Sequence, residues 1–525
     1  MHYLPYFLCI SLCVSLILGC DDPSHSDLEW TLEETRLLEK SPLFFVDTSQ
    51  LYQDEEFRSL VRTALRQWVA KPVFAEGMHT DWAFGEGDPS LGLSVAISQK
   101  PEFDSLVDLP HKIAKPNWPL WYEKTVLNPE SRWLYIKGDD GVQVFWDGKP
   151  ISSHKGQYFK IPASPDALTL SIRVLNNAMG GGLQKVFWIN DDAFQSYQEQ
   201  YEIFGYAQQL LWHYWQQPEK VLAAEIINRI EQKDTSKLEA ILGVFPPLLP
   251  TNMPDLHTTS DTTFSFTAWG DSQGGWRTFQ HLIDHMQNSA DAFSIGLGDL
   301  VANGIEEQQW ISFQQCLQPL LAVQPVFSIA GNHDYDGYYK DLIPLLYKEQ
   351  ILPEGKERTY FSWVYGNAFF LALDPNEAFP LSLSGQQTIW MEEQLNSPAW
   401  ENAQWHFVLI HQPPYAQGWP GYHGDDFVRE FIEGKAAEKK IDFVLSGHTH
   451  DYERLAKDFE NQVTHCFVLG GAGGSLEPEE SSDFPKMDLI RKEHHFARFK
   501  VKQSDIEIKI INLEGQVVDS LLVSK

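Results

Sequence analysis

Five short segments of this sequence each end an apolar run in side chains that bind metal ions. They are Trp-Gly-Asp-Ser-Gln at 269–273, Gly-Leu-Gly-Asp at 296–299, Ala-Gly-Asn-His-Asp at 330–334, Val-Leu-Ile-His at 408–411 and Leu-Ser-Gly-His-Thr-His at 445–450. Carboxylates, one amide and several imidazoles are the side chains that a hydrolase with two metal ions requires. These residue types therefore predict metal-assisted hydrolysis.

The elements that must position these segments begin near residue 262, where apolar strands alternate with helical stretches. We expect strands at 264–269, 293–297, 326–329, 369–373, 407–410, 443–445 and 467–469, and helices at about 276–289, 306–322, 386–395 and 426–439. Such alternation is typical of a layered α/β domain, in which ligands gather beyond the carboxyl ends of the strands. Each of the five segments falls at such an end, so the sequence predicts that they form one site.

In order and spacing, the five segments resemble the calcineurin-like metallophosphoesterases. The resemblance implies a central β-sandwich flanked by helices and two divalent or mixed-valence metal ions, drawn from Fe, Mn and Zn. The ligands that it implies are Asp271, Asp299, Asn332, His411, His448 and His450. Asp299 would bridge the ions, with Asp271 and His450 completing one of them. Two ions about 3.5–4 Å apart lower the pKa of a bridging water and hold the phosphoryl oxygens.

Two residues next to these ligands are predicted to be catalytic. His333 follows Asn332 and is placed to protonate the leaving oxygen, and Asp334 is placed to orient the His333 imidazole.

Finer features resemble the purple-acid-phosphatase-like branch of the family. They are Gly-His-Thr-His-Asp-Tyr-Glu-Arg at 447–454, Tyr-Phe-Ser-Trp-Val-Tyr-Gly-Asn at 360–367 and Gly-Gly-Ala-Gly-Gly at 470–474. Two positions depart from the pattern. Ala302 stands where that branch has its iron-bound tyrosine, and Gln273 stands where many members have a ligating histidine. Gln273 would be a weak, neutral metal ligand, so the first metal is expected to be bound more loosely.

The N-terminus predicts export. Residues 3–19 are almost wholly apolar and end before Cys20 and two aspartates, which resembles a bacterial lipoprotein signal with Cys20 carrying the lipid. The alternative is an ordinary cleaved signal in which Cys20 is incidental. Either way, we expect an exported protein, anchored in the bacterial cell envelope if Cys20 is lipidated. Cys316 and Cys466 are expected to be buried free thiols, although export would permit a disulfide.

The sequence divides into five predicted parts: a lipoprotein-type signal peptide at 1–20, a helical segment at 21–79, an all-β sandwich at 80–192, a helical connector and linker at 193–261, and the catalytic domain at 262–525. The sandwich is predicted from strands at 132–136, 142–146 and 168–174, with Asp-Gly turn signals at 140–141 and 147–148. Residues 195–243 are expected to form two helices.

Within the sandwich, residues 109–111, 117–125 and 138–149 resemble the galactose-binding-like jelly-roll modules of glycoside hydrolases. That resemblance leaves two interpretations open for Trp118, Trp121 and Trp146. They either stack on a bound glycan or pack in the core and the domain interface, and the second interpretation is favoured.

Composition limits the partners. With 40 basic and 72 acidic residues the formal net charge is −32, and such a field repels nucleic-acid backbones. The predicted function is an exported, two-metal phosphoesterase acting on small phosphomonoesters. The alternatives are a phosphodiesterase or nucleotidase with the same site, or a carbohydrate-binding surface lipoprotein with a vestigial hydrolase domain.

Overall fold

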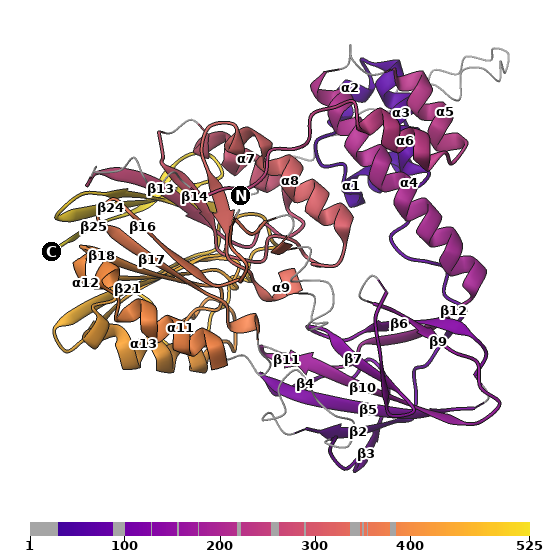
Figure 1. Ribbon diagram of the computed structural model, residues 1–525, viewed down its shortest axis with the longest axis horizontal. Coiled ribbons are helices and arrows are strands. Elements are labelled where there is room, and N and C mark those ends of the chain that lie inside the picture. Colours follow the sequence, from indigo (N-terminus) through magenta and orange to yellow (C-terminus); the bar gives the residue numbers. More distant parts are fainter. Residues whose placement is uncertain are drawn as a thin grey trace, which may run out of the picture.

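The computed structural model (Figure 1) describes residues 30–87, 100–127, 129–154, 157–176, 178–217, 222–253, 262–287, 290–335, 347–348, 351–353, 355–377 and 385–525. Figure 1 shows three parts: a helical part and a β-sandwich, which both lie beside a layered α/β part. The predicted signal peptide at 1–20, with Cys20, lies outside the described residues. Within the described ranges, no helix is both long and apolar enough to span a bilayer.

The helical part combines segments that precede and segments that follow the β-sandwich in the sequence. Its members are α1 (Leu32–Lys40), α2 (Thr48–Leu51), α3 (Glu55–Leu65), α4 (Asp191–Gln216), α5 (Ala223–Glu231) and α6 (Thr235–Leu242). Aromatic pairs join the two sides: Phe57 stacks on Tyr214 with ring centroids 5.5 Å apart, and the Phe45 and Trp212 centroids are 5.1 Å apart. The predicted N-terminal helical segment is confirmed, whereas the stretch predicted as two helices contains three among its described residues.

The β-sandwich has two main sheets, with strand orders β1-β12-β6-β9 and β3-β2-β5-β10-β7-β8, and a small pair β11-β4. Its strands are β1 (Glu76–Gly77), β2 (Trp82–Glu86), β3 (Ser105–Val107), β4 (Ile113–Ala114), β5 (Trp118–Val126), β6 (Arg132–Lys137), β7 (Val142–Trp146), β8 (Lys149–Ile151), β9 (Tyr158–Ile161), β10 (Leu168–Asn176), β11 (Gly180–Gly181) and β12 (Lys185–Ile189). All three strands predicted here are present.

The two predicted turns behave differently. Asp147 and Gly148, at φ 48° and 75°, form the two-residue hairpin loop between β7 and β8. Asp140 and Gly141 instead carry the chain from β6 in one sheet to β7 in the other.

The three tryptophans of the sandwich are largely covered. Trp121 and Trp146 are buried, and Trp118 is half-buried with the Lys115 ammonium 4.4 Å above its ring. The core interpretation therefore holds for Trp121 and Trp146, which present no open face for a sugar.

The C-terminal α/β part is built on two sheets packed face to face. One sheet has the order β15-β14-β13-β23-β24-β25 and the other β16-β17-β18-β19-β21-β20-β22. The strands are β13 (Phe264–Trp269), β14 (Phe293–Gly296), β15 (Val326–Ser328), β16 (Phe361–Tyr365), β17 (Ala368–Leu373), β18 (Trp405–Ile410), β19 (Phe443–Ser446), β20 (Tyr452–Phe459), β21 (Gln462–Leu469), β22 (Leu489–Arg491), β23 (His495–Val501), β24 (Asp505–Asn512) and β25 (Val517–Ser524).

Helices cover the outer faces of this sandwich (Figure 1), and the chain also forms two short helical turns near the site. They are α7 (Trp276–Met286), α8 (Glu307–Leu321), α9 (Asn332–Tyr335), η4 (Pro375–Glu377), α11 (Gly385–Leu395), α12 (Pro398–Asn402) and α13 (Asp426–Lys439). In β18, Phe407 and Leu409 face the opposite sheet while Val408 and Ile410 pack under α11 and α13. Because both faces are buried, the strand is apolar apart from His406, which is itself buried.

The strands and helices predicted from residue 262 onward are all present. Phe266 of the first sheet meets Phe370 and Phe407 of the second, with ring centroids 5.4 and 5.6 Å apart. Cys316 and Cys466 are buried free thiols, as the sequence predicted.

Candidate metal centre

The parallel strands of both sheets end at the same edge of the C-terminal sandwich. Asp271 follows β13, Asp299 follows β14, and Asn332 follows β15. His411 follows β18 of the opposite sheet, and His448 and His450 follow β19 in the same way. The structure therefore brings the six predicted ligands together.

The backbone at this edge is strained. Asp271, Asp299 and His448 have φ of 61°, 51° and 74°, a region that non-glycine residues seldom adopt and that is common at functional sites. Glycines allow the close approach. A Cβ added to Gly447 would lie 2.3 Å from Asp271 Oδ2, and one on Gly331 would lie 2.2 Å from Asp299 Oδ1. The glycines of the motifs are therefore required by packing around the carboxylates.

The three predicted histidine ligands are each held by a hydrogen bond from the same ring nitrogen, Nδ1. His411 Nδ1 donates to Leu297 O at 2.7 Å, His448 Nδ1 to Asn332 Oδ1 at 3.1 Å, and His450 Nδ1 to Ser475 O at 2.7 Å. Each hydrogen bond favours the proton on Nδ1, so Nε2 is the nitrogen that would bind a metal ion, which is how proteins prepare histidine ligands.

Three of the six predicted ligands are arranged so that they could bind one metal ion. The ligand atoms of Asp299, His411 and His448 all lie within 4.8 Å of one another. The Nε2 atoms of His411 and His448 are buried; that of His411 lies 3.3 Å from Asp299 Oδ2, and that of His448 has no hydrogen-bond partner among the described residues. Buried polar atoms are normally satisfied, so two inward-facing imidazole nitrogens beside a buried carboxylate fit a cation. Asn332, bonded to His448, completes the predicted second ion site.

The other predicted ion site centres on Asp271. This fully buried carboxylate accepts from the His448 backbone N–H at 3.0 and 2.9 Å and lies 3.6 Å from His450 Nε2. Gln273 Nε2 lies 2.6 Å from the same imidazole nitrogen. Gln273 is therefore next to the ligands of the first ion, where the sequence placed it.

The pKa values of the predicted metal ligands are strongly shifted. Burial, together with the neighbouring Asp299 charge, raises the pKa of Asp271 well above its usual value even though His411 opposes it. Burial alone would raise the pKa of Asp299, but His411 and His333 lower it overall. Burial lowers the pKa of His448 to about 3. Adjacent buried carboxylates are costly without compensating charge, and bound cations supply it.

His333 stands at the mouth of the site. Its ring is exposed, its backbone N–H donates to Asp299 Oδ1 at 2.9 Å, and its Nδ1 donates to Ala302 O at 3.2 Å. This position suits proton delivery to a leaving group. Ala302 offers no side-chain donor to a metal.

The predicted orienting role of Asp334 is wrong. Its buried carboxylate accepts from the backbone N–H groups of Leu300 at 2.9 Å, Val301 at 3.3 Å and Gly331 at 2.8 Å. Asp334 thus ties the loop after β14 to the loop after β15, and those loops carry Asp299 and Asn332. Burial, with the nearby Asp299 charge, raises its pKa to about 7.

The residues after His450 are structural. Glu453 is buried and accepts from the backbone N–H groups of Gln417 at 2.7 Å and Gly418 at 2.9 Å. These bonds fix the loop that carries Trp419, whose ring centroid is 5.9 Å from that of His448.

A cleft of about 430 Å³ opens over the metal ligands and is closed on its far side by the N-terminal β-sandwich. Its lining includes Asp299, Asn332, His333, His448, His450, Trp419 and Glu477 on one side and Lys112, Lys137, Asp139, Asp140, Met179 and Gln184 on the other. The sequence motifs pointed to none of the sandwich residues. Among them, Asp140 belongs to the Asp-Gly turn signal at 140–141, and residues 138–149 belong to the segment that resembles galactose-binding-like modules.

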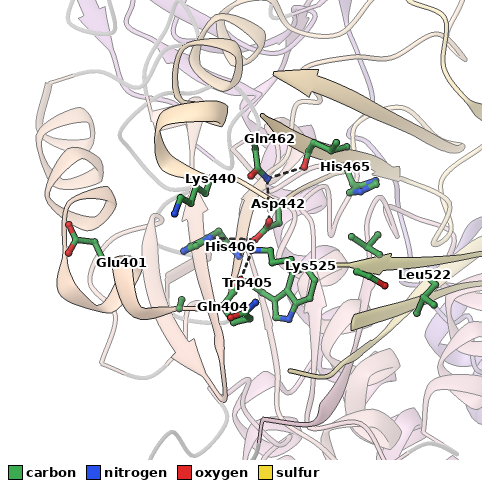
Figure 2. Close-up of a pocket in the computed structure, with 14 residues that line it drawn as sticks. Glu401, Gln404, Trp405, His406, Lys440, Asp442, Gln462, His465, Leu522 and Lys525 are labelled. Carbon is green, nitrogen blue, oxygen red and sulfur yellow. Dashed lines mark hydrogen bonds and ion pairs between the residues drawn. The ribbon is translucent and has the colours of Figure 1, made fainter. Parts of the chain in front are cut away.

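Figure 2 shows a larger cavity of about 640 Å³ near the amino ends of β18, β19 and β21. There Asp442 Oδ2 accepts from Lys525 Nζ at 2.7 Å and lies 3.4 Å from His406 Nδ1. The cavity is lined by none of the predicted metal ligands, and it lies at the opposite end of the strands from them.

Residues 255–452 match the family model described as calcineurin-like phosphoesterase. Purple acid phosphatase 23 of Arabidopsis thaliana is 23% identical over 193 residues, which are 35% of this chain and 42% of that protein. Purple acid phosphatase 5 of the same plant is 23% identical over 270 residues, 48% of this chain and 63% of that protein. The chain spans about half the length of the curated relatives it matches. The structure of a purple acid phosphatase from yellow lupin (Lupinus luteus) seeds is 13% identical and aligns over 81% of this chain and 78% of that one, with a TM-score of 0.45.

Proposed function

We propose that this chain hydrolyses phosphate esters with two bound metal ions, through the part that matches the calcineurin-like phosphoesterase model, residues 255–452. The observation that carries this proposal is the convergence of carboxylates and imidazoles at the strand ends, with the Nε2 atoms of His411 and His448 buried and facing inward. Asp299 would bridge the ions, with Asp271 and His450 on one side and Asn332, His411 and His448 on the other.

Bound metal ions would supply an activated water and charge to stabilise the phosphoryl oxygens. The protein's own residues do the remaining work. Asp334 holds the two ligand loops together, and Glu453 fixes the loop beside His448. His333, exposed on the cleft, donates the proton that the leaving oxygen needs.

We propose phosphomonoesters as the substrates. The support is that the β-sandwich bounds one side of the cleft over the predicted metal ligands, which limits the room around a phosphoryl group held there. A phosphodiester requires room for a second substituent.

The test is a panel of phosphomonoesters and phosphodiesters assayed with protein reconstituted with Mn, Zn or Fe. We expect monoesters to be hydrolysed with the higher kcat/KM. A higher kcat/KM for diesters would overturn the monoester assignment, and no turnover of either class by metal-loaded protein would overturn the function.

Export and lipid anchoring are a separate proposal, which rests on the apolar run at 3–19 and on Cys20. A multiply acylated Cys20 binds a membrane firmly, whereas one chain binds only marginally. The protein should therefore partition into detergent, and Cys20→Ser should release it or block processing. Water-soluble wild-type protein that begins at another residue would refute the anchor.

A further inference from the structure

We propose that the N-terminal β-sandwich forms the leaving-group side of the active-site cleft and selects phosphate esters whose leaving group is polyhydroxylated, such as a sugar or a polyol. The inference rests on the proposed function, because it concerns the group that the hydrolysed ester releases.

The first support is position. The cleft is bounded by Asp299, Asn332 and His448 on one side and by the β-sandwich residues Lys112 and Lys137 on the other. In Figure 1 the sandwich lies beside α9, the helical turn that begins with Asn332. A substrate held at the metal ligands must therefore extend toward the sandwich.

Contacts hold the sandwich in this place. Asn332 Nδ2 donates to Asp140 Oδ1 at 3.4 Å, so a residue of the sandwich bonds a predicted metal ligand directly. Met179 packs against the loop after β18, since a Cβ added to Gly421 would lie 2.9 Å from its Cε. The wall of the cleft is thus tied to the metal side at two points.

The proton donor fixes which part of the substrate meets this wall. His333 lines the same cleft as Lys137 and Asp139 of the sandwich. Because a general acid must lie within hydrogen-bond reach of the leaving oxygen, the leaving group lies on the side of His333. That side faces the sandwich.

The chemistry of the wall indicates the kind of leaving group. Lys112 and Lys137 offer ammonium donors, Asp139 offers a carboxyl, and the Gln184 amide both donates and accepts, with its Nε2 3.3 Å from Asp139 Oδ1. A hydroxyl both donates and accepts a hydrogen bond, so neighbouring hydroxyls match a wall that mixes both kinds of group.

Two other leaving groups fit less well. An apolar group would cover the ammonium, carboxyl and amide groups without pairing them, which is unfavourable. A second anionic group would meet the carboxyls of Asp139 and Asp140 as well as the two lysines, so the wall is not a purely cationic site for it.

The test compares kcat/KM for glucose 6-phosphate and for phenyl phosphate, using metal-loaded full-length protein. The variants are Lys112→Ala, Lys137→Ala, Gln184→Ala and the triple combination, and Lys149→Ala, an exposed lysine on β8 outside the cleft, is the matched control. We expect the ratio of glucose 6-phosphate to phenyl phosphate to fall about tenfold or more in the variants, the size expected for a lost charged hydrogen bond. Lys149→Ala should keep the wild-type ratio.

An unchanged ratio in the triple variant, or an equal loss on both substrates, would overturn the inference while the proposed function stands. No hydrolysis of either ester by wild-type protein would instead overturn the proposed function. Metal content and thermal melting are measured for every variant, and if the triple variant does not fold, the ratios of the three single variants decide.

Discussion

At the scale of residues, the site is prepared by hydrogen bonds between segments that lie far apart in the sequence. The sequence identified His411 and His450 as ligands, but their Nδ1 atoms donate to Leu297 O and Ser475 O, which belong to other segments. Residue type and spacing predict which side chains reach the site. Tautomers depend on distant backbone carbonyls, which leave no pattern in the sequence.

His333→Ala should keep both metals and lose about 10²–10⁴ in rate on esters with poor leaving groups, the range typical of general acid catalysis. The loss should be smaller for 4-nitrophenyl phosphate, because nitrophenolate leaves with little protonation. Steady-state kinetics with both kinds of ester, beside elemental analysis, check this. Equal losses on both would assign His333 a binding or structural role.

Gln273 and Ala302 determine a second residue-scale prediction. A histidine at 273 should hold the first metal more tightly, because an imidazole is more basic than the amide that now contacts His450. Iron-loaded protein should show no intense tyrosinate band, because Ala302 has no donor atom. Chelator titration of wild type and Gln273→His tests the first expectation, and visible spectra of iron-loaded protein test the second. The predicted ligands would be wrong if Gln273→His held metal no more tightly than wild type, or if a strong purple band appeared.

At the scale of elements, the strands that carry the site were predictable, and the packing between their loops was not. Strands buried on both faces, such as β18, stand out through apolar runs, here Phe407–Ile410, that end at a polar motif. Asp334 was misassigned because it directly follows His333, and consecutive residues of a helical turn do not face each other. Its real partners lie in the loop after β14, about thirty residues earlier in the chain.

Asp334→Ala should weaken metal binding and lower stability by about 1–3 kcal/mol, because backbone N–H groups in both ligand loops lose their acceptor. Urea denaturation and metal titration measure the two effects. Asp284→Ala, on the exposed side of α7, is the control and should change neither. Wild-type metal affinity in Asp334→Ala would contradict the assigned role.

Glu453 gives a pH prediction at the same scale. Burial, with the neighbouring Asp451 charge, raises its pKa from 4.5 to about 8. Between these values the folded protein holds a proton that the unfolded chain releases, so this contribution to stability is lost as the pH rises through the window. Glu453→Gln should therefore lose less unfolding free energy than wild type between about pH 5 and about pH 8. Urea denaturation measures the free energy of unfolding of both proteins across this range. Equal losses in wild type and Glu453→Gln would contradict the prediction.

At the scale of the whole molecule, the sequence predicted the helical, β-sandwich and α/β parts but not how they meet. The bond between Asp140 and Asn332 joins residues 192 positions apart, and the helical part combines segments from both sides of the sandwich. Periodicity describes each element alone, so neither contact leaves a sequence signal. The cleft over the predicted metal ligands therefore includes residues from outside the family-matched domain.

The most direct test of the central claim is the metal content of wild type and Asp299→Ala after reconstitution. Wild-type protein should hold two metal ions per chain and hydrolyse a phosphomonoester. Asp299→Ala should lose both ions and the activity together, because neither ion keeps its full set of protein ligands. Asp192→Ala, an exposed aspartate on α4, should behave as wild type. Two bound ions in Asp299→Ala, or none in wild type, would contradict the account.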